Sequence, residues 1–140
     1  MKKLTNLFTA LFLLTIVSSA QPNTQSKDIV EIKTDIYEVI YNTTYQQPLV
    51  VEYTIFCKPD SPTYPRHGIS FKAFPGLDGS SSSDYSDNIY DKGHMAPAST
   101  FACTEKWLKE TFSYANCALQ HQGLNRGTWA ALERFERNLA

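Results

Sequence analysis

Alternating apolar and polar residues predict strands in the first half of the chain. Residues 28–42 (DIVEIKTDIYEVIYN) alternate and are rich in Ile, Val and Tyr, which predicts one or two strands. Residues 48–58 (PLVVEYTIFCK) give the clearest strand, and both of its faces are largely apolar. We expect such a strand to lie inside a sheet rather than at its edge. Residues 68–74 (GISFKAF) predict a further short strand.

Two helix patterns follow the strands and are separated from them by loops. Three prolines in residues 59–66 and a run of serines in residues 75–87 predict loops. Residues 104–112 (TEKWLKETF) predict a short helix with Thr104 as its N-cap. The Ala, Leu, Glu and Arg content of residues 125–140 predicts a second helix. Strands followed by helices favour the α+β class.

The first twenty residues have the pattern of a secretory signal peptide. A basic start precedes the apolar run from Leu7 to Val17, and small residues lead to a predicted cleavage after Ala20. The run is short for a bilayer span, which needs roughly 20 apolar residues, and an uncleaved anchor is the alternative. We therefore expect a secreted or periplasmic protein of residues 21–140 with no stable membrane association; the pattern leaves its oligomeric state open.

The net charge limits how this chain can bind nucleic acid. Without Lys2 and Lys3, the 13 basic residues fall to 11, against 14 acidic residues. A net charge near −3 argues against a protein that coats nucleic acid with a broad basic face. Any contact with phosphate groups must therefore occur at a small local site.

Three cysteines remain after the first twenty residues: Cys57, Cys103 and Cys117. Export permits a disulfide, and we expect Cys103 to pair with Cys117, because both lie in the same C-terminal unit. The odd count leaves one thiol over, and none of the three has the spacing of a zinc site.

Residues whose side chains could take part in catalysis or metal binding are concentrated between positions 91 and 137. Asp91-Lys92-Gly93-His94 comes first, where the histidine is either a structural strand residue or a base that a substrate can reach. Asn116 and Gln120 follow, and then the stretch LNRGTWAALE at residues 124–133. At 100° per residue, one side of the final helix carries Asn125, Trp129, Leu132, Glu133, Glu136 and Arg137. Glu133 and Arg137 are also spaced as a simple surface ion pair.

In this order, these residues resemble the signature of the DNA/RNA non-specific endonucleases, or ββα-metal nucleases. That signature is Asp-Arg-Gly-His, then Asn-x-x-x-Gln, then Leu-Asn-x-Gly-x-Trp-x-x-Leu-Glu, and residues 91–133 match nearly every fixed position. The resemblance implies an antiparallel sheet with a ββα-metal finger of the His-me type packed on it. Residues 21–47 are then a lead-in with strands, and residues 48–140 a partial nuclease domain, because domains of the family continue beyond this length.

The resemblance also implies a role for each matched residue. His94 corresponds to the general base, Asn125 to the side chain that binds the metal directly, and Glu133 to the acid that holds the metal's water. Lys92 stands where the family usually has arginine, and so keeps the charge without the planar fork that grips phosphate. The other matched positions are a phosphate-stabilising arginine and three supporting residues: Arg137, Asp91, Asn116 and Gln120. We expect one strand with His94, a second with Asn116 and the helix near Asn125 to surround one ion.

Together these features predict an exported endonuclease that depends on Mg²⁺, with Mn²⁺ or another divalent cation as the alternative. The resemblance implies that it cuts DNA and RNA with little sequence specificity and leaves 5′-phosphate ends. One alternative is a truncated, weak or inactive module that only binds nucleic acid or a partner. Another is that the first 90 residues form a separate β module.

Overall fold

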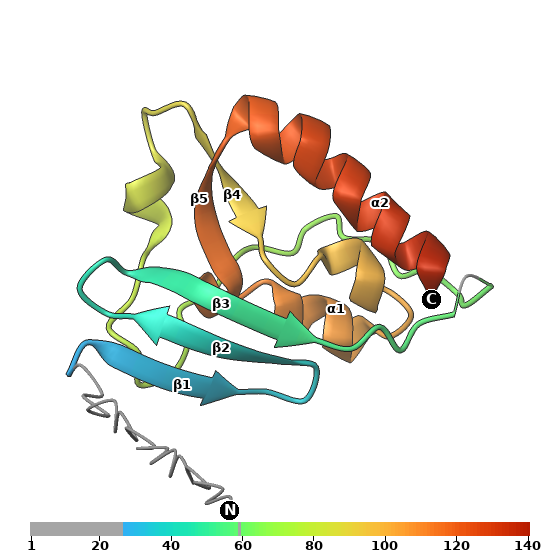
Figure 1. Cartoon of the computed structure of the whole chain (residues 1–140), viewed down its shortest axis with the longest axis horizontal. Helices are drawn as coiled ribbons and strands as arrows, with labels where there is room; N and C mark the ends of the chain where they lie inside the picture. Colours follow the sequence, from blue (N-terminus) through green and yellow to red (C-terminus); the bar gives the residue numbers. More distant parts are fainter. Residues whose placement is uncertain (1–26, 59) are drawn as a thin grey trace, which may run out of the picture.

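The first strands of the chain form a three-stranded antiparallel sheet (Figure 1). The computed structural model describes residues 27–58 and 60–140, so the predicted signal peptide lies outside the described residues. The sheet contains β1 (Ile29–Lys33), β2 (Tyr37–Asn42) and β3 (Gln47–Tyr53), in the order β1-β2-β3. The alternating pattern of residues 28–42 thus forms two strands, as one of its two readings predicted. None of the helices in the described residues is long and apolar enough to cross a membrane.

Strand β3 is an edge strand, so the prediction of an interior position was wrong. Its regular part ends at Tyr53, and Leu49 and Val50 are about half exposed. Only Val51 and Tyr53 of this strand pack against the main core. The apolar residues on both faces of this strand predicted that it would be buried, but the tertiary structure leaves part of it exposed. The predicted strand at residues 68–74 is also absent: Lys72 makes only an isolated bridge to Ser113.

A second, two-stranded sheet and two helices complete the described fold. Strand β4 (Tyr90–His94) pairs antiparallel with β5 (Cys117–His121). Between them lies α1 (Glu105–Thr111), whose N-cap is the predicted Thr104: its hydroxyl accepts a hydrogen bond from Trp107 N. After β5 the chain enters a π-helical segment, η4 (Leu124–Trp129), and then α2 (Ala130–Leu139). The 3₁₀ segments are η1 (Ser82–Tyr85), η2 (Ala98–Phe101) and η3 (Tyr114–Asn116).

One hydrophobic core joins the two halves of the chain. Its buried members come from β1, β2 and the segments around η2 and η3: Ile32, Ile36, Tyr37, Val39, Tyr41, Ala96, Phe101 and Ala115. Helix α2 has no buried residue and is tied to the sheet by Tyr53, whose hydroxyl donates to Glu136 Oε2 at 2.6 Å. Described residues from before and after position 90 therefore share this core. The α+β class is confirmed.

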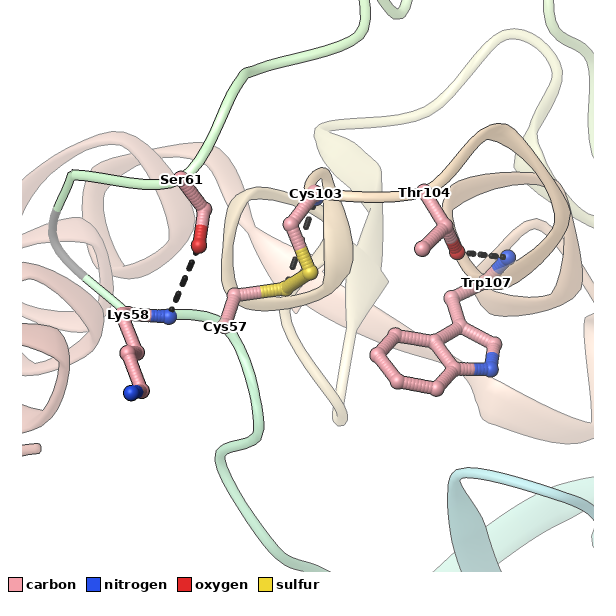
Figure 2. The surroundings of a disulfide bond; sticks show 6 residues. All are labelled: Cys57, Lys58, Ser61, Cys103, Thr104 and Trp107. Atoms are coloured by element: carbon pink, nitrogen blue, oxygen red, sulfur yellow. Dashed lines mark hydrogen bonds between the residues drawn. A yellow bond between two sulfur atoms is a disulfide. The ribbon is translucent and has the colours of Figure 1, made fainter.

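The disulfide joins Cys57 to Cys103, and not Cys103 to Cys117 as the sequence suggested (Figure 2). Cys57 lies in the irregular segment after β3, and Cys103 immediately precedes the N-cap of α1. Cys117 is a free, fully buried thiol at the start of β5, where it pairs in register with His94. Nearness in sequence was a poor guide, because the fold brings the segment after β3 against the start of α1.

Candidate active site

A small cavity of about 170 Å³ is lined by most of the residues predicted to be catalytic or metal-binding. Strand β4 supplies Lys92 and His94, η4 supplies Asn125, and α2 supplies Glu133. These four come from segments separated by up to 41 positions, yet they line one space with Arg66, Ala98, Ser99 and Ala130. We call this space the His94 pocket. The ring of His94 and the amide of Asn125 thus share a cavity.

His94 is the last residue of β4 and is only 7% exposed. Its ring lies between Phe71 and Phe112, with both ring centroids 4.6 Å away. Burial lowers the pKa of His94 to about 3, and the positive charge of Arg66 acts in the same direction. The imidazole is therefore neutral at neutral pH. Its Nε2 atom is buried without a hydrogen-bond partner in the described part of the chain.

Asp91 fixes the orientation of Asn125. Its Oδ2 atom accepts hydrogen bonds from Asn125 Nδ2 at 2.9 Å and from Arg126 Nε at 2.8 Å. The other carboxylate oxygen accepts from Arg126 Nη2 at 2.7 Å, which completes a two-pronged ion pair. Arg126, and then Asn125, hold the pKa of Asp91 below its usual value. Because the amide nitrogen is engaged with Asp91, the carbonyl oxygen is the atom of Asn125 left to bind a ligand.

Glu133 and Lys92 contribute opposite charges to the His94 pocket. Burial raises the pKa of Glu133, while the nearby Arg137 opposes the shift. Lys92 Nζ lies over the rings of Tyr85 and Tyr114, at 5.7 Å and 5.5 Å from their centroids. It also donates to Ser82 Oγ at 3.4 Å. The aromatic rings and Ser82 thus hold the lysine ammonium group, although none of these three residues is among those that line the pocket with Lys92.

Two of the predicted supporting residues lie beside the pocket rather than in its wall. Asn116 is fully buried at the end of η3, not in a strand as expected. Its side chain joins two backbone segments by hydrogen bonds. It accepts from Ala96 N at 2.7 Å and donates to the carbonyls of Ala96 and Thr111. These bonds fix the segment that follows His94. Gln120 is 5% exposed and occupies the space above Gly93.

Gly93 is required by that close approach. A Cβ atom at position 93 would lie 2.2 Å from Gln120 Cδ. The register of β4 with β5 runs without a bulge from Tyr90↔His121 to His94↔Cys117. Glycine therefore leaves room for the buried Gln120 side chain against β4.

Arg66 and Arg137 differ most from the sequence-based picture. Arg66 carries no motif in the sequence and lies in the proline-rich loop, yet it lines the His94 pocket. It is placed by Phe112, whose ring it faces at 5.7 Å and which also contacts His94. Arg137 lines a different cavity, next to the disulfide. The phosphate-stabilising role predicted for Arg137 stays a prediction.

The donor atoms of the His94 pocket fit a hydrated divalent ion. Among the described residues there is no group of three or more His, Cys, Asp or Glu side chains that could enclose a metal. The pocket offers instead the amide oxygen of Asn125 and the carboxylate of Glu133. Oxygen ligands in small number suit Mg²⁺, which keeps several of its waters in protein sites. His94, whose Nε2 atom has no hydrogen-bond partner among the described residues, lines the same space.

Comparisons with known proteins agree with this arrangement. Nuclease C1 of Cunninghamella echinulata var. echinulata is 42% identical over 66 residues, which are 46% of this chain and 26% of that protein. Human mitochondrial endonuclease G is 36% identical over 56 residues, which are 40% of this chain and 19% of that protein. The chain thus matches about a quarter or less of the length of these relatives.

The fold also has a counterpart among solved structures. The crystal structure of the EndoG/EndoGI complex superposes with a TM-score of 0.67 and 28% identity, over 78% of this chain and 47% of that chain. Strands β4 and β5 and helix α2 are the two strands and the helix of a ββα-metal nuclease fold. The family model described as DNA/RNA non-specific endonuclease matches residues 18–140. The chain belongs to the DNA/RNA non-specific endonuclease family.

Proposed function

We propose that this protein is a metal-dependent nuclease that hydrolyses phosphodiester bonds of DNA and RNA with little sequence specificity. The observation that carries the proposal is the His94 pocket, in which a neutral, buried imidazole faces the same space as Asn125, Glu133 and two cationic side chains. The names of the relatives, nuclease and endonuclease G, support the same class of reaction.

His94 acts as the general base in this proposal. Its Nε2 atom accepts a proton from a water molecule, and the water oxygen forms a bond to phosphorus as the bond between phosphorus and O3′ breaks. This course leaves a 5′-phosphate and an O3′ oxyanion, which takes a proton from solvent water to become the 3′-hydroxyl; the proton on His94 returns to solvent. Phe71 and Phe112 hold the ring and keep it neutral, so that it can accept a proton without first losing one.

The remaining residues bind and orient. Lys92 and Arg66 offer positive charge to the oxygens of the scissile phosphate. Asn125 and Glu133 would hold a divalent ion, which supplies charge that stabilises the phosphate and the leaving oxygen. Asp91 keeps the Asn125 amide in one orientation. Since all these groups address phosphate and none reads a base edge, we expect little sequence preference on either nucleic acid.

The test is cleavage of plasmid DNA and of an RNA transcript by the purified chain. We expect nicking with Mg²⁺, none with EDTA, and a loss of about 10²- to 10⁴-fold in rate for His94→Ala, the usual contribution of a positioned base. His67→Ala is the matched control, because His67 is exposed and lies outside the pocket. Equal rates for wild type and His94→Ala would remove His94 from the mechanism. Strand binding without cleavage would favour the binding-only alternative.

We also propose that the protein is exported. The signal-peptide pattern of residues 1–20 supports this, and a disulfide between Cys57 and Cys103 suits an oxidising compartment. In the native host, N-terminal sequencing of protein from the medium or periplasm should begin at Gln21. Recovery of the chain in the cytosol, beginning at Met1, would contradict the proposal.

A further inference from the structure

A second cavity of about 300 Å³ lies beside the disulfide and is lined by residues of α2 and of the segment after β3. The C-terminal end of α2 lies near this segment in Figure 1. We call the cavity the disulfide cavity. Two of its lining residues are cationic, and several carry hydroxyl or amide groups. None of the described lining residues is a carboxylate; they are Cys57, Lys58, Ser61, Pro62, Thr63, Ser99, Thr100, Ala102, Cys103, Arg137 and Asn138. Such a lining favours an anion.

Two of the lining residues each have a polar side-chain atom that is buried without a partner among the described residues. Thr100 is only 1% exposed, and its Oγ1 atom makes no hydrogen bond. Arg137 Nη1 is likewise buried and unpaired. A buried polar group without a partner costs about 1–3 kcal/mol, so a fold seldom keeps two such atoms around one cavity unless something binds them.

The disulfide holds in place the segment that carries Lys58, the second cationic residue of the disulfide cavity. Lys58 follows Cys57, and its backbone nitrogen donates to Ser61 Oγ at 3.1 Å (Figure 2). Because that bond uses Ser61 Oγ as an acceptor, the hydroxyl hydrogen of Ser61 remains free to donate. Cys103 N also donates to Cys57 Sγ at 3.4 Å, which ties the segment to the start of α1. The cavity is thus built on a cross-linked part of the chain.

Several residues line more than one cavity, and they relate the disulfide cavity to the His94 pocket. Ser99 lines both spaces. An intervening, more apolar cavity of about 240 Å³ shares Arg66, Ala98 and Ser99 with the His94 pocket. It shares Thr63, Ser99 and Ala102 with the disulfide cavity. This arrangement would let a strand with one phosphate in the His94 pocket run along η2 toward the second cluster of donors.

We propose that the disulfide cavity binds a second phosphate of the same nucleic-acid strand, near the one that is cleaved. This inference rests on the proposed function and adds to it a substrate with at least two internucleotide phosphates. Arg137 and Lys58 supply the charge, and the hydroxyls of Thr100 and Ser61 donate to phosphate oxygens. Arg137 then binds the second phosphate in this cavity, and not the scissile phosphate that lies next to His94.

The test measures binding of short oligothymidylates with one, two or three phosphates, at several salt concentrations. The protein is the full chain with Mg²⁺ and His94→Gln, which prevents cleavage during the measurement. We expect affinity to rise when the second phosphate is added. Lys58→Gln and Thr100→Val should each remove at least about threefold of that gain, in line with charge-assisted hydrogen bonds. Lys58→Gln should also lower the salt slope by about 0.7, the value for one contact with a single strand.

Lys72→Gln is the matched control, because Lys72 has no ion pair among the described residues and lines a separate cavity near α1. It should retain the full gain. Equal losses in the Lys58 and Lys72 variants would show a general charge effect and overturn the inference, as would a wild-type affinity that does not change with the second phosphate. Failure of the nuclease proposal is distinct: the protein with His94 intact would then not cleave with Mg²⁺.

Discussion

At the scale of single residues, His94 is governed by what surrounds its ring. The rings of Phe71 and Phe112 pack against the imidazole, and the nearest charge that shifts its pKa is the cation of Arg66. Both effects disfavour the protonated form, so the pKa falls. Burial and the nearby cation therefore keep the imidazole neutral at neutral pH.

Burial of His94 makes the free energy of unfolding depend on pH. The pKa is 6.5 in the unfolded chain and about 3 in the fold, so between these values only the unfolded state binds the proton. The contribution is complete above pH 6.5 and is lost as pH falls, by about 1.4 kcal/mol per unit. From pH 7 to pH 5 we expect a loss of about 2 kcal/mol, measured by urea unfolding.

His94→Gln provides the reference for that measurement, since glutamine does not titrate and every other group is common to both proteins. The wild type should lose stability relative to the variant as pH falls from 7 to 5. Parallel curves for the two proteins would mean that the ring is protonated as easily in the fold as in the unfolded chain.

The motif residues and Arg66 differ in what the sequence can reveal. His94, Asn125 and Glu133 stand in a recognisable order, and the structure brings all three to one pocket. Arg66 lies in an irregular loop, where neither periodicity nor spacing marks it. Its place depends on Phe112, at the end of a helix 46 positions later, and on the packing of that ring against His94. Long-range packing of this kind leaves no local pattern.

At the scale of elements, the β4–β5 pair depends on one glycine. Gly93→Ala should lower the free energy of unfolding by about 1–3 kcal/mol, because the new methyl group overlaps Gln120, which is buried and has little room to move. The measurement is chemical denaturation. Gly127→Ala is the matched control: nothing lies within 4 Å of its Cβ position, and alanine favours the helix, so we expect no loss or a gain of about 0.5–1 kcal/mol.

A second change separates the steric cause from a backbone cause. If Gln120 is the obstacle, Gly93→Ala should cost less in a Gln120→Ala background than in the wild type. An unchanged cost in that background would show that the strand itself, and not the crossing side chain, excludes alanine.

Local signals predicted some elements well and others poorly. Helix α1 was predictable because its cap, Thr104, acts within its own first turn. Strands β1 and β2 were predictable from alternation, since inward residues such as Ile32 and Val39 are buried. The edge position of β3 was not, because strand order depends on which neighbours the rest of the chain provides. The segment at residues 68–74 has strand composition but only one bridging residue.

At the scale of the whole molecule, the Cys57–Cys103 bond links the segment after β3 to α1 across 46 positions. The sequence could not identify this pair, because three cysteines allow three pairings and the distance between segments is set by the fold. The same bond carries Lys58 into one wall of the disulfide cavity. A single cross-link therefore bears on both the stability of the chain and the path proposed for the strand.

Reduction of this disulfide should lower the free energy of unfolding by about 4 kcal/mol at 25 °C, because the unfolded chain regains the freedom of a loop of 46 residues. Urea unfolding of the wild type with and without a reductant measures the difference. The double variant Cys57→Ser/Cys103→Ser should be as unstable as the reduced wild type and indifferent to reductant. Since Lys58 is adjacent to Cys57, the double variant should also lose part of the affinity gained from a second phosphate. A wild type whose unfolding midpoint ignores the reductant, or whose peptide map joins Cys103 to Cys117, would contradict the bond and its place beside the cavity.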